Sequence, residues 1–249
     1  MAQPIVFYDI PIKDRTKPTP WSPNTWKVRY ALNLKGLKYK TEWLEYLEIE
    51  PTVKSLGGAP TGKKPDGSDF YTLPTIYDPN TKAVVVNSAT IAKYLDDTYP
   101  DTPRLFPAGS DAFQAAFLDT AWADVGLHVF MLVILDSASH MFPLSHAYFR
   151  ETREATYGDK LERLATEDEW KAVETGLAKW RGYFEANGEG GDLLFMGTQG
   201  TITYSDLQIA AYFVWAKTVW GGDSARWKRL TALHGGKWAK FCAQFTKFE

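Results

Sequence analysis

The sequence predicts two folded parts, an α/β part followed by an all-helical part. Strand and helix signals alternate up to about residue 99, whereas helical periodicity dominates after residue 111. Between them, three prolines and a glycine interrupt both patterns, as in linkers (Pro100, Pro103, Pro107 and Gly109). We therefore expect domains at 1–99 and 111–249, joined by a linker at 100–110.

The first part begins with a β-type run at residues 5–12, followed by a helix at 21–34 with apolar residues at i, i+3 and i+4 on one face. Gly36 follows the last turn, where glycine commonly ends a helix. Residues 39–47 alternate between the two sides of a second strand. The strand-helix-strand unit makes this pair of strands parallel.

Residues 48–70 are irregular and rich in glycine and proline, with room for at most one short helix. Two short runs at 75–77 and 83–86, separated by Asp-Pro-Asn-Thr, predict a hairpin, and residues 88–97 predict a closing helix. The resulting order, β-α-β-(α)-β-β-α, is that of the thioredoxin fold, in which helices cover both faces of a sheet.

The second part begins with a predicted helix over residues 113–139 that is apolar nearly all round and should be largely buried. Gly126 inside it indicates a close backbone approach or a bend. Two more helices follow start signals in which a threonine precedes an acid by three residues: Thr166 with Glu169 before 167–185, and Thr203 with Asp206 before the apolar run 207–220.

Composition narrows the class of protein. Of 249 residues, 45% are hydrophobic and 23% charged, and the net charge of −2 gives no sign of a nucleic-acid binder. The single cysteine suits a reducing compartment. The four histidines lack the spacing of metal ligands. The most apolar run, 129–135, is too short to span a bilayer. We expect a soluble cytoplasmic protein that binds no nucleic acid, membrane or metal ion, and the N-terminus does not read as a secretory signal.

The first of three local signals lies at the start of the first helix. Ser22 is a good N-cap and Pro23 suits the first turn, so a plain helix cap explains both residues. Alternatively, a hydroxyl at the positive helix end could stabilise an anion such as a thiolate, with Asn24 adding a second donor.

The other two signals lie at the neighbouring sheet end. Pro74 marks a strand start, or else a cis peptide bond that would free the backbone of Leu73 to pair with an extended peptide. Asn87 and Ser88 cap the next helix, or else hold a carboxylate at its N-terminus. Each signal alone is weak, and their order along one small sheet is the informative observation.

Together the segments WSPNTWKVRYAL, TLPTIYD and NSATIAKYLDDTYP resemble the cytosolic glutathione transferases. The break near residue 100 and the start signal at Thr203 fit the same family, so the resemblance covers nearly the whole chain. The closest resemblance is to the fungus-specific, etherase-like class A of the serine type. Its members carry a serine within WSPN after an extended loop, here residues 13–20.

The resemblance also implies roles for individual residues. Ser22 matches the residue that polarises the glutathione thiol, and Asn24 assists it. Asn87 stands where the family has an acid. The remaining implied contacts are those to the cysteinyl group by Thr72, Leu73 and a cis Pro74, to the γ-glutamyl end by Asn87 and Ser88, and to the glycine carboxylate by Lys54, Lys63 or Lys64. The first helix lacks a cysteine, so thiol-exchange chemistry is not expected.

Aromatic content is high, with 10 Trp, 13 Tyr and 14 Phe. Most of these rings should be core, because large rings dominate protein cores. A minority should line a hydrophobic substrate pocket, for which the candidates are Trp21, Pro23, Phe117, Thr120, Ala121 and Asp124.

The resemblance implies a homodimeric transferase that joins glutathione to aromatic or hydrophobic electrophiles, as in the detoxification of xenobiotic or wood-derived compounds. Two alternatives stay open. One is a ligandin-type protein that binds polyphenolic molecules with incidental catalysis, since an aromatic pocket binds flat rings without chemistry. The other is glutathione-dependent cleavage of aryl ethers.

Overall fold

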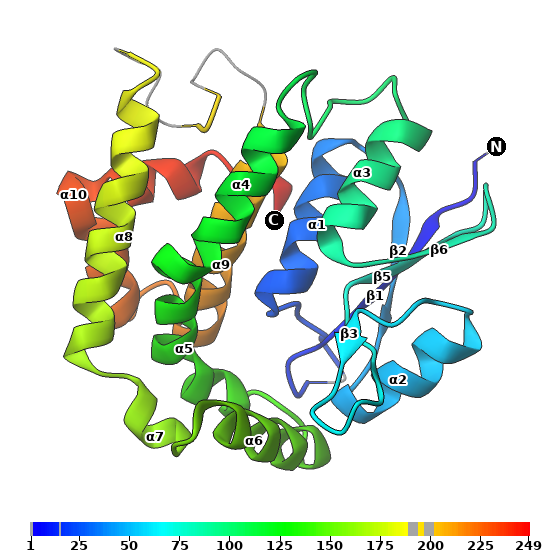
Figure 1. The fold of residues 1–249 in the computed structure, drawn as a ribbon, viewed down its shortest axis with the longest axis horizontal. Coiled ribbons are helices and arrows are strands. Elements are labelled where there is room, and N and C mark those ends of the chain that lie inside the picture. Colours follow the sequence, from blue (N-terminus) through cyan, green and yellow to red (C-terminus); the bar gives the residue numbers. More distant parts are fainter. Residues whose placement is uncertain (1, 15, 189–193, 197–201) are drawn as a thin grey trace.

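The computed structural model describes residues 2–14, 16–188, 194–196 and 202–249. Figure 1 shows two parts side by side, a small sheet with its helices and a bundle of longer helices. Helices α1 and α3 lie between the sheet and the helical part, and α1 packs against α9. The fold class predicted from the sequence, a thioredoxin-like domain followed by a helical domain, is confirmed.

The sheet has the strand order β2-β1-β5-β6, with β1 parallel to β2 and antiparallel to β5. A second, two-stranded sheet, β3–β4, forms a small hairpin. The elements of this part are β1 (Ile5–Asp9), α1 (Pro23–Leu34), β2 (Tyr39–Trp43), α2 (Tyr46–Ser55), β3 (Gly62–Lys63), β4 (Asp69–Phe70), β5 (Thr75–Asp78), β6 (Ala83–Val86) and α3 (Ser88–Thr98).

Two strands are shorter than the sequence predicts. The first ends at Asp9 because Pro11 lacks the N–H that a ladder needs, and Pro11 instead forms an isolated bridge with Pro20 that closes the following loop. The second ends at Trp43 because a capping box around Glu45 starts α2. The hairpin β3–β4 was not predicted, since each strand is only two residues long.

The helical part contains the two predicted start signals and more helices than predicted. Helices α6, α7 and α10 were missed because their sequences carry mixed polar patterns or glycines. The elements are α4 (Asp111–Ala121), η1 (Trp122–Gly126), α5 (Leu127–Ser139), α6 (Pro143–Tyr157), α7 (Leu161–Leu164), α8 (Glu167–Glu185), α9 (Tyr204–Trp220), α10 (Ala225–Ala243) and η2 (Thr246–Phe248).

The predicted long helix is continuous but contains a π-helical turn, η1, at its middle. Gly126 ends that turn, and a Cβ on it would collide with Tyr212 of α9. A Cβ on Gly176 of α8 would come even closer to the backbone oxygen of Asp124. The close approach expected at Gly126 is therefore confirmed. The whole helix, Asp111–Ser139, is long and apolar enough to cross a membrane, but it packs against α8 and α9 as a core helix.

Candidate active site

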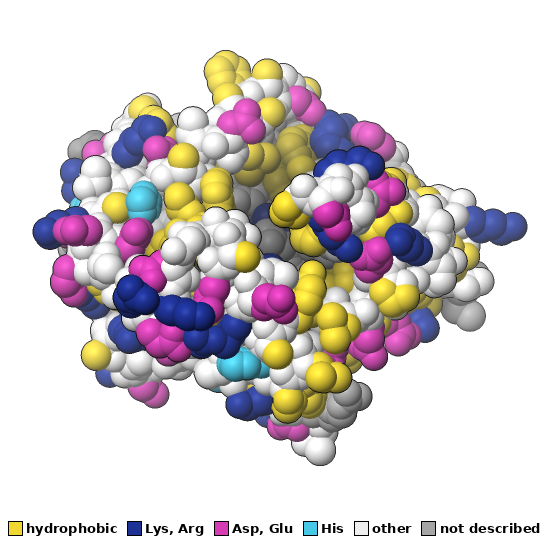
Figure 2. All heavy atoms as spheres, turned by 60° about the horizontal axis from the view of Figure 1, so that its bottom comes forward, with side chains coloured by type: hydrophobic (Ala, Val, Ile, Leu, Met, Phe, Trp, Pro, Cys, Tyr) yellow, Lys and Arg dark blue, Asp and Glu magenta, His cyan; other side chains and the backbone are white. Residues whose placement is uncertain are grey.

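The first two sequence signals meet around one cavity of about 210 Å³, where the first turn of α1 faces the turn before β5. Seen from the side of α2 and α6, the surface is hollowed between the two parts of the molecule, and hydrophobic side chains border the hollow (Figure 2). The lining residues are Ile10, Ser22, Asn24, Tyr46, Ile49, Phe70, Tyr71, Thr72, Leu73, Tyr148 and Arg153.

Ser22 is the N-cap of α1, with Pro23 as the first helical residue. Its side chain does not accept a hydrogen bond from the helix, although an N-cap serine usually does so. The residue is only 6% exposed and lines the cavity. Within the described part of the chain, the Ser22 hydroxyl has no hydrogen-bond partner. Because the residue lines the cavity and its hydroxyl is not bonded to the folded chain, that hydroxyl is available to a bound group.

The first turn of α1 is held from behind by a buried ion pair. The Thr25 hydroxyl donates to the Ser22 carbonyl at 3.1 Å and lies beside Asp9 at the end of β1. Arg29 donates to Asp9 at 2.7 Å and lies among four aromatic rings, with its Cζ 5.2–5.8 Å from their centroids. Burial raises the pKa of Asp9, and Arg29 opposes that rise. Thr25, Asp9 and Arg29 together hold the backbone of Ser22 in position.

Asn24 reaches the same cavity and is held by a buried lysine. The Lys27 ammonium donates to Asn24 Oδ1 at 2.9 Å, so the amide nitrogen of Asn24 is left to donate to another group. Lys27 is 8% exposed, and no carboxylate of the described chain lies within ion-pair distance of it. Burial lowers the pKa of Lys27 to about 8. The sequence did not indicate a role for Lys27, because a lysine within a helix is usually expected to be exposed to solvent.

The Leu73–Pro74 peptide bond is cis. Neither the N–H nor the C=O of Leu73 bonds to another described backbone group, so both are available to an extended ligand. The carbonyl of Pro74 accepts a hydrogen bond from the N–H of Asn87 at 3.2 Å. That bond brings the start of α3 beside the turn, so the second and third sequence signals are neighbours in space.

Asn87 and Ser88 lie outside the lining of this cavity. Asn87 caps α3 with a positive φ of 74°, and its side chain accepts from the N–H of Ala89. Ser88 is buried and hydrogen-bonds the Tyr204 side chain of α9. Of the two, only the exposed Asn87 presents its side chain to solvent at the helix end.

The six candidate substrate residues are not among those that line this cavity, although Trp21 and Pro23 flank Ser22 in the sequence. Phe117 is buried against the rings of Trp180 and Phe195, and Ala121 is buried in the same core. That side of α4 turns toward α8, because the π turn and Gly176 draw the two helices together. The other four candidates have different surroundings. Thr120 is exposed and its hydroxyl donates to the Phe117 carbonyl, and Asp124 forms an ion pair with Lys179. Trp21 packs against the ring of Phe149, and Pro23 is the first residue of α1.

The three candidate lysines for the glycine carboxylate are already engaged. Lys54 and Lys64 both pair with Glu50, and Lys63 pairs with Asp69. The described side chains include no group of three metal-ligand residues that could hold an ion.

Comparison with known proteins agrees with this geometry. Residues 21–98 match the family described as "Glutathione S-transferase, N-terminal domain", and residues 112–248 match "Glutathione S-transferase, C-terminal domain". The crystal structure of glutathione transferase GSTFuA2 from Phanerochaete chrysosporium is 63% identical. It superposes with a TM-score of 0.97 and covers 100% of this chain and 99% of its own.

Two further relatives agree. The glutathione S-transferase CsGST63524 of Ceriporiopsis subvermispora, solved in complex with glutathione, is 40% identical, with a TM-score of 0.92 over 99% of this chain and 98% of that one. The glutathione S-transferase-like protein ustS of Aspergillus flavus is 27% identical over 94% of this chain and 87% of its own length. The fold and site thus define a two-domain, glutathione-using protein. The chain belongs to the glutathione transferase family, and glutathione is its co-substrate.

Proposed function

We propose that the protein joins glutathione to hydrophobic, aromatic electrophiles by stabilising the glutathione thiolate at the N-terminus of α1. The observation that carries this proposal is the hydroxyl of Ser22, a largely buried residue that lines the cavity and whose side chain is not used to cap its own helix. A hydroxyl held there can donate to sulfur, and the positive helix end favours the anion.

In the proposed step, Ser22 donates to the sulfur and the Asn24 amide adds a second N–H donor. The thiol proton leaves to solvent, and the sulfur attacks an electrophilic carbon while the leaving group departs with the electron pair of the broken bond. The rate gain comes from a larger thiolate fraction and from proximity, without a covalent enzyme intermediate. The backbone of Leu73 pairs with the cysteinyl group, beside Thr72 and Pro74, and the N-terminus of α3 at Asn87 and Ser88 lies toward the γ-glutamyl end.

Lys27 acts as a positioning residue in this proposal. Its ammonium occupies Asn24 Oδ1, so the Asn24 amide presents its nitrogen rather than its oxygen. An acceptor oxygen near the thiolate would repel it, whereas an N–H donor stabilises it.

The test is the pKa of enzyme-bound glutathione, read from thiolate absorbance during a pH titration. Ser22→Ala should raise that pKa and lower turnover about 10- to 100-fold, the range of a charge-assisted hydrogen bond of about 1.5–3 kcal/mol. Ser110→Ala is a matched control, because Ser110 is a 5% exposed N-cap serine remote from the cavity. Unchanged thiol pKa and activity in Ser22→Ala would remove the serine from the mechanism.

The acceptor is proposed to bind in an adjoining cavity of about 470 Å³ between the hairpin β3–β4 and α6, in place of the α4 stripe. It is lined by Lys63, Lys64, Pro65, Asp66, Phe70, Tyr148, Thr152, Arg153, Ala155 and Thr156. Three of these residues, Phe70, Tyr148 and Arg153, also line the Ser22 cavity, so the two cavities are neighbours.

Storage of polyphenolic ligands is the second candidate function, and the same mainly apolar cavity supports it. Steady-state conjugation rates, set beside dissociation constants for phenolic ligands, separate the two. Tight binding with negligible conjugation favours storage. Release of a phenol from an aryl-ether substrate would instead establish ether cleavage, in which the thiolate displaces an aryloxide.

The proposal also covers the class of transferase, the oligomeric state and the cellular location of the protein. The WSPN motif and the loop at 13–20 support the fungus-specific, etherase-like class and a role in detoxification. A cytoplasmic homodimer is supported by the single cysteine and by Phe113 of α4, whose side chain is 75% exposed and open to a partner. Sedimentation at micromolar concentration tests the dimer, and a monomer would contradict it.

A further inference from the structure

The cavity between the hairpin and α6 holds one cation that differs from its neighbours. Arg153 of α6 is half-buried and stands where the two cavities meet. Its Cζ lies 4.6 Å from the ring centroid of Phe149 and 5.6 Å from that of Tyr46. Its Nη1 donates to the Thr152 hydroxyl at 2.8 Å. The guanidinium is thus held in place by two rings and one hydroxyl.

No carboxylate in the described part of the chain lies within ion-pair distance of Arg153. On the opposite wall, Lys63 pairs with Asp69 at 2.6 Å, and Lys64 pairs at 2.7 Å with Glu50, a carboxylate that it shares with Lys54. Asp66 also lines the cavity and adds one negative charge near Lys64. Four cations around the cavity therefore face three carboxylates, and Arg153 is the one of these cations without an ion-pair partner in the described part of the chain.

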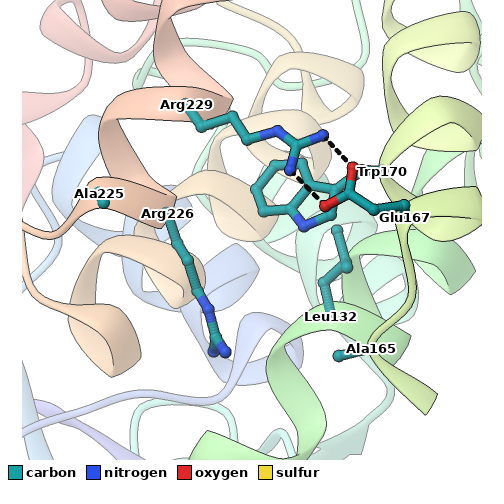
Figure 3. Close-up of a pocket in the computed structure, with 7 residues that line it drawn as sticks. All are labelled: Leu132, Ala165, Glu167, Trp170, Ala225, Arg226 and Arg229. Carbon is teal, nitrogen blue, oxygen red and sulfur yellow. Dashed lines mark hydrogen bonds and ion pairs between the residues drawn. The ribbon is translucent and has the colours of Figure 1, made fainter. Parts of the chain in front are cut away.

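A second arginine-lined cavity provides the contrast. In the helical part, Arg229 of α10 stacks on Trp170 with its Cζ 4.3 Å from the ring centroid, much as Arg153 stacks on Phe149. Figure 3 shows the two terminal nitrogens of that guanidinium, Nη1 and Nη2, paired with Glu167; the distances are 2.8 and 2.7 Å. The stacking is alike in the two places, and the protein supplies the counter-charge in only one of them.

We propose that Arg153 makes the cavity between the hairpin and α6 selective for aromatic acceptors that carry an anionic group such as a carboxylate. A planar guanidinium pairs with a carboxylate through two parallel N–H donors, and the rings of Phe70 and Tyr148 cover a flat apolar body. The inference rests on the proposed conjugating function and specifies its substrate class.

The test compares two acceptors of nearly the same shape, 4-chloro-3-nitrobenzoate and 4-chloro-3-nitrobenzamide. In both, the thiolate sulfur bonds to the ring carbon that carries chlorine, and chloride leaves with the electron pair of its bond. Their intrinsic reactivities differ, so the quantity measured is the ratio of kcat/KM for benzoate to that for benzamide. Each variant is compared with the wild-type protein.

In Arg153→Met, which keeps the length of the side chain, this ratio should fall about 10-fold or more, the effect of losing one charge-assisted pair. Arg153→Lys keeps a charge and should lose less. In the matched control Arg229→Met, the ratio should stay at the wild-type value. Thermal unfolding of each variant identifies any that fails to fold.

An unchanged ratio in folded Arg153→Met would overturn the inference. So would a higher KM for glutathione with both acceptors affected equally, because Arg153 would then serve the glycine carboxylate. If the wild-type protein turns over neither acceptor, the proposed function fails. Calorimetric dissociation constants for the same two compounds then decide the inference about Arg153. Tighter binding of the benzoate that Arg153→Met abolishes supports the inference, and equal affinities refute it.

Discussion

Two helix N-termini in this chain use similar residues in opposite ways. At the start of α9, the N–H and the hydroxyl of Thr203 both donate to Asp206 Oδ2, at 2.8 and 2.7 Å, and Oδ1 accepts from the N–H of Phe195 at 2.7 Å. At the start of α1, the Ser22 hydroxyl makes no bond to its own helix and opens on a cavity.

The α9 cap satisfies its own helix and stabilises the fold, whereas the α1 cap leaves its hydroxyl available to a bound ligand. The α9 cap is complete and buried at the centre of the molecule, where α9 packs on α1. The α1 cap lacks an acid three residues on and has Thr25 there, whose hydroxyl points back to the Ser22 carbonyl. Loss of the first cap should therefore cost stability, and loss of the second should cost activity.

The largest effect is expected for Asp206→Ala, which should lower the free energy of unfolding by about 3 kcal/mol because it leaves buried donors unpaired. Urea unfolding at pH 7 measures it, and activity per folded molecule should hardly change. A loss below about 0.5 kcal/mol, typical of a surface substitution, would contradict the role given to this cap.

The same carboxyl should also make stability depend on pH. Burial raises the pKa of Asp206 to about 6, so between pH 4 and pH 6 the folded state binds its proton more tightly than the unfolded state does. Its contribution is greatest below pH 4 and declines as pH rises through 6. Asp206→Asn should remove that part of the pH dependence.

The next largest effect is expected for Ser22→Ala, which should lower activity and leave stability nearly unchanged. Turnover falls 10- to 100-fold as argued above, while the free energy of unfolding should stay within about 0.5 kcal/mol of wild type, since no bond of the folded chain is lost. Urea unfolding of both alanine variants, measured side by side, checks this. A destabilisation equal to that of Asp206→Ala would mean that Ser22 is structural.

Lys27→Met should have a smaller effect, a rise of about one unit in the pKa of bound glutathione, worth about 1.4 kcal/mol. Because the pKa of Lys27 is lowered to about 8, the unfolded chain binds this proton more tightly between pH 8 and pH 10.5. Wild-type stability should therefore gain from this group as pH rises through that window, and the variant should lack the gain. An unaltered thiol pKa together with altered stability would leave Lys27 a purely structural residue.

The smallest effect is expected for Asn87→Asp. Asn87 stands at the exposed end of α3, where a negative charge would attract an amino group and suit the helix dipole. The variant should lower the KM for glutathione by a factor of about 3 to 5, or about 1 kcal/mol, with kcat unchanged. A KM that stays constant would place the γ-glutamyl end elsewhere.

The sequence predicted the order of the α/β part and the positions of Ser22, Leu73 and Pro74, because helix caps and proline leave local signals. It did not indicate the cavity that we propose for the acceptor. Phe117 has the spacing of a pocket residue, yet its side of α4 faces α8, and only tertiary packing decides which side of an apolar helix is free. Lys27 and Arg153 were missed for a related reason, since the absence of a nearby carboxylate is visible only in three dimensions.

The π turn at Trp122–Gly126 also bears on how this chain should be aligned with others. A π turn holds one more residue than the α-helical turn it replaces, and it shifts every following side chain around the helix axis. A relative with an unbroken helix at this point should therefore show a one-residue gap here. Without that gap, residues after 126 would be matched to neighbours that face a different side of the helix.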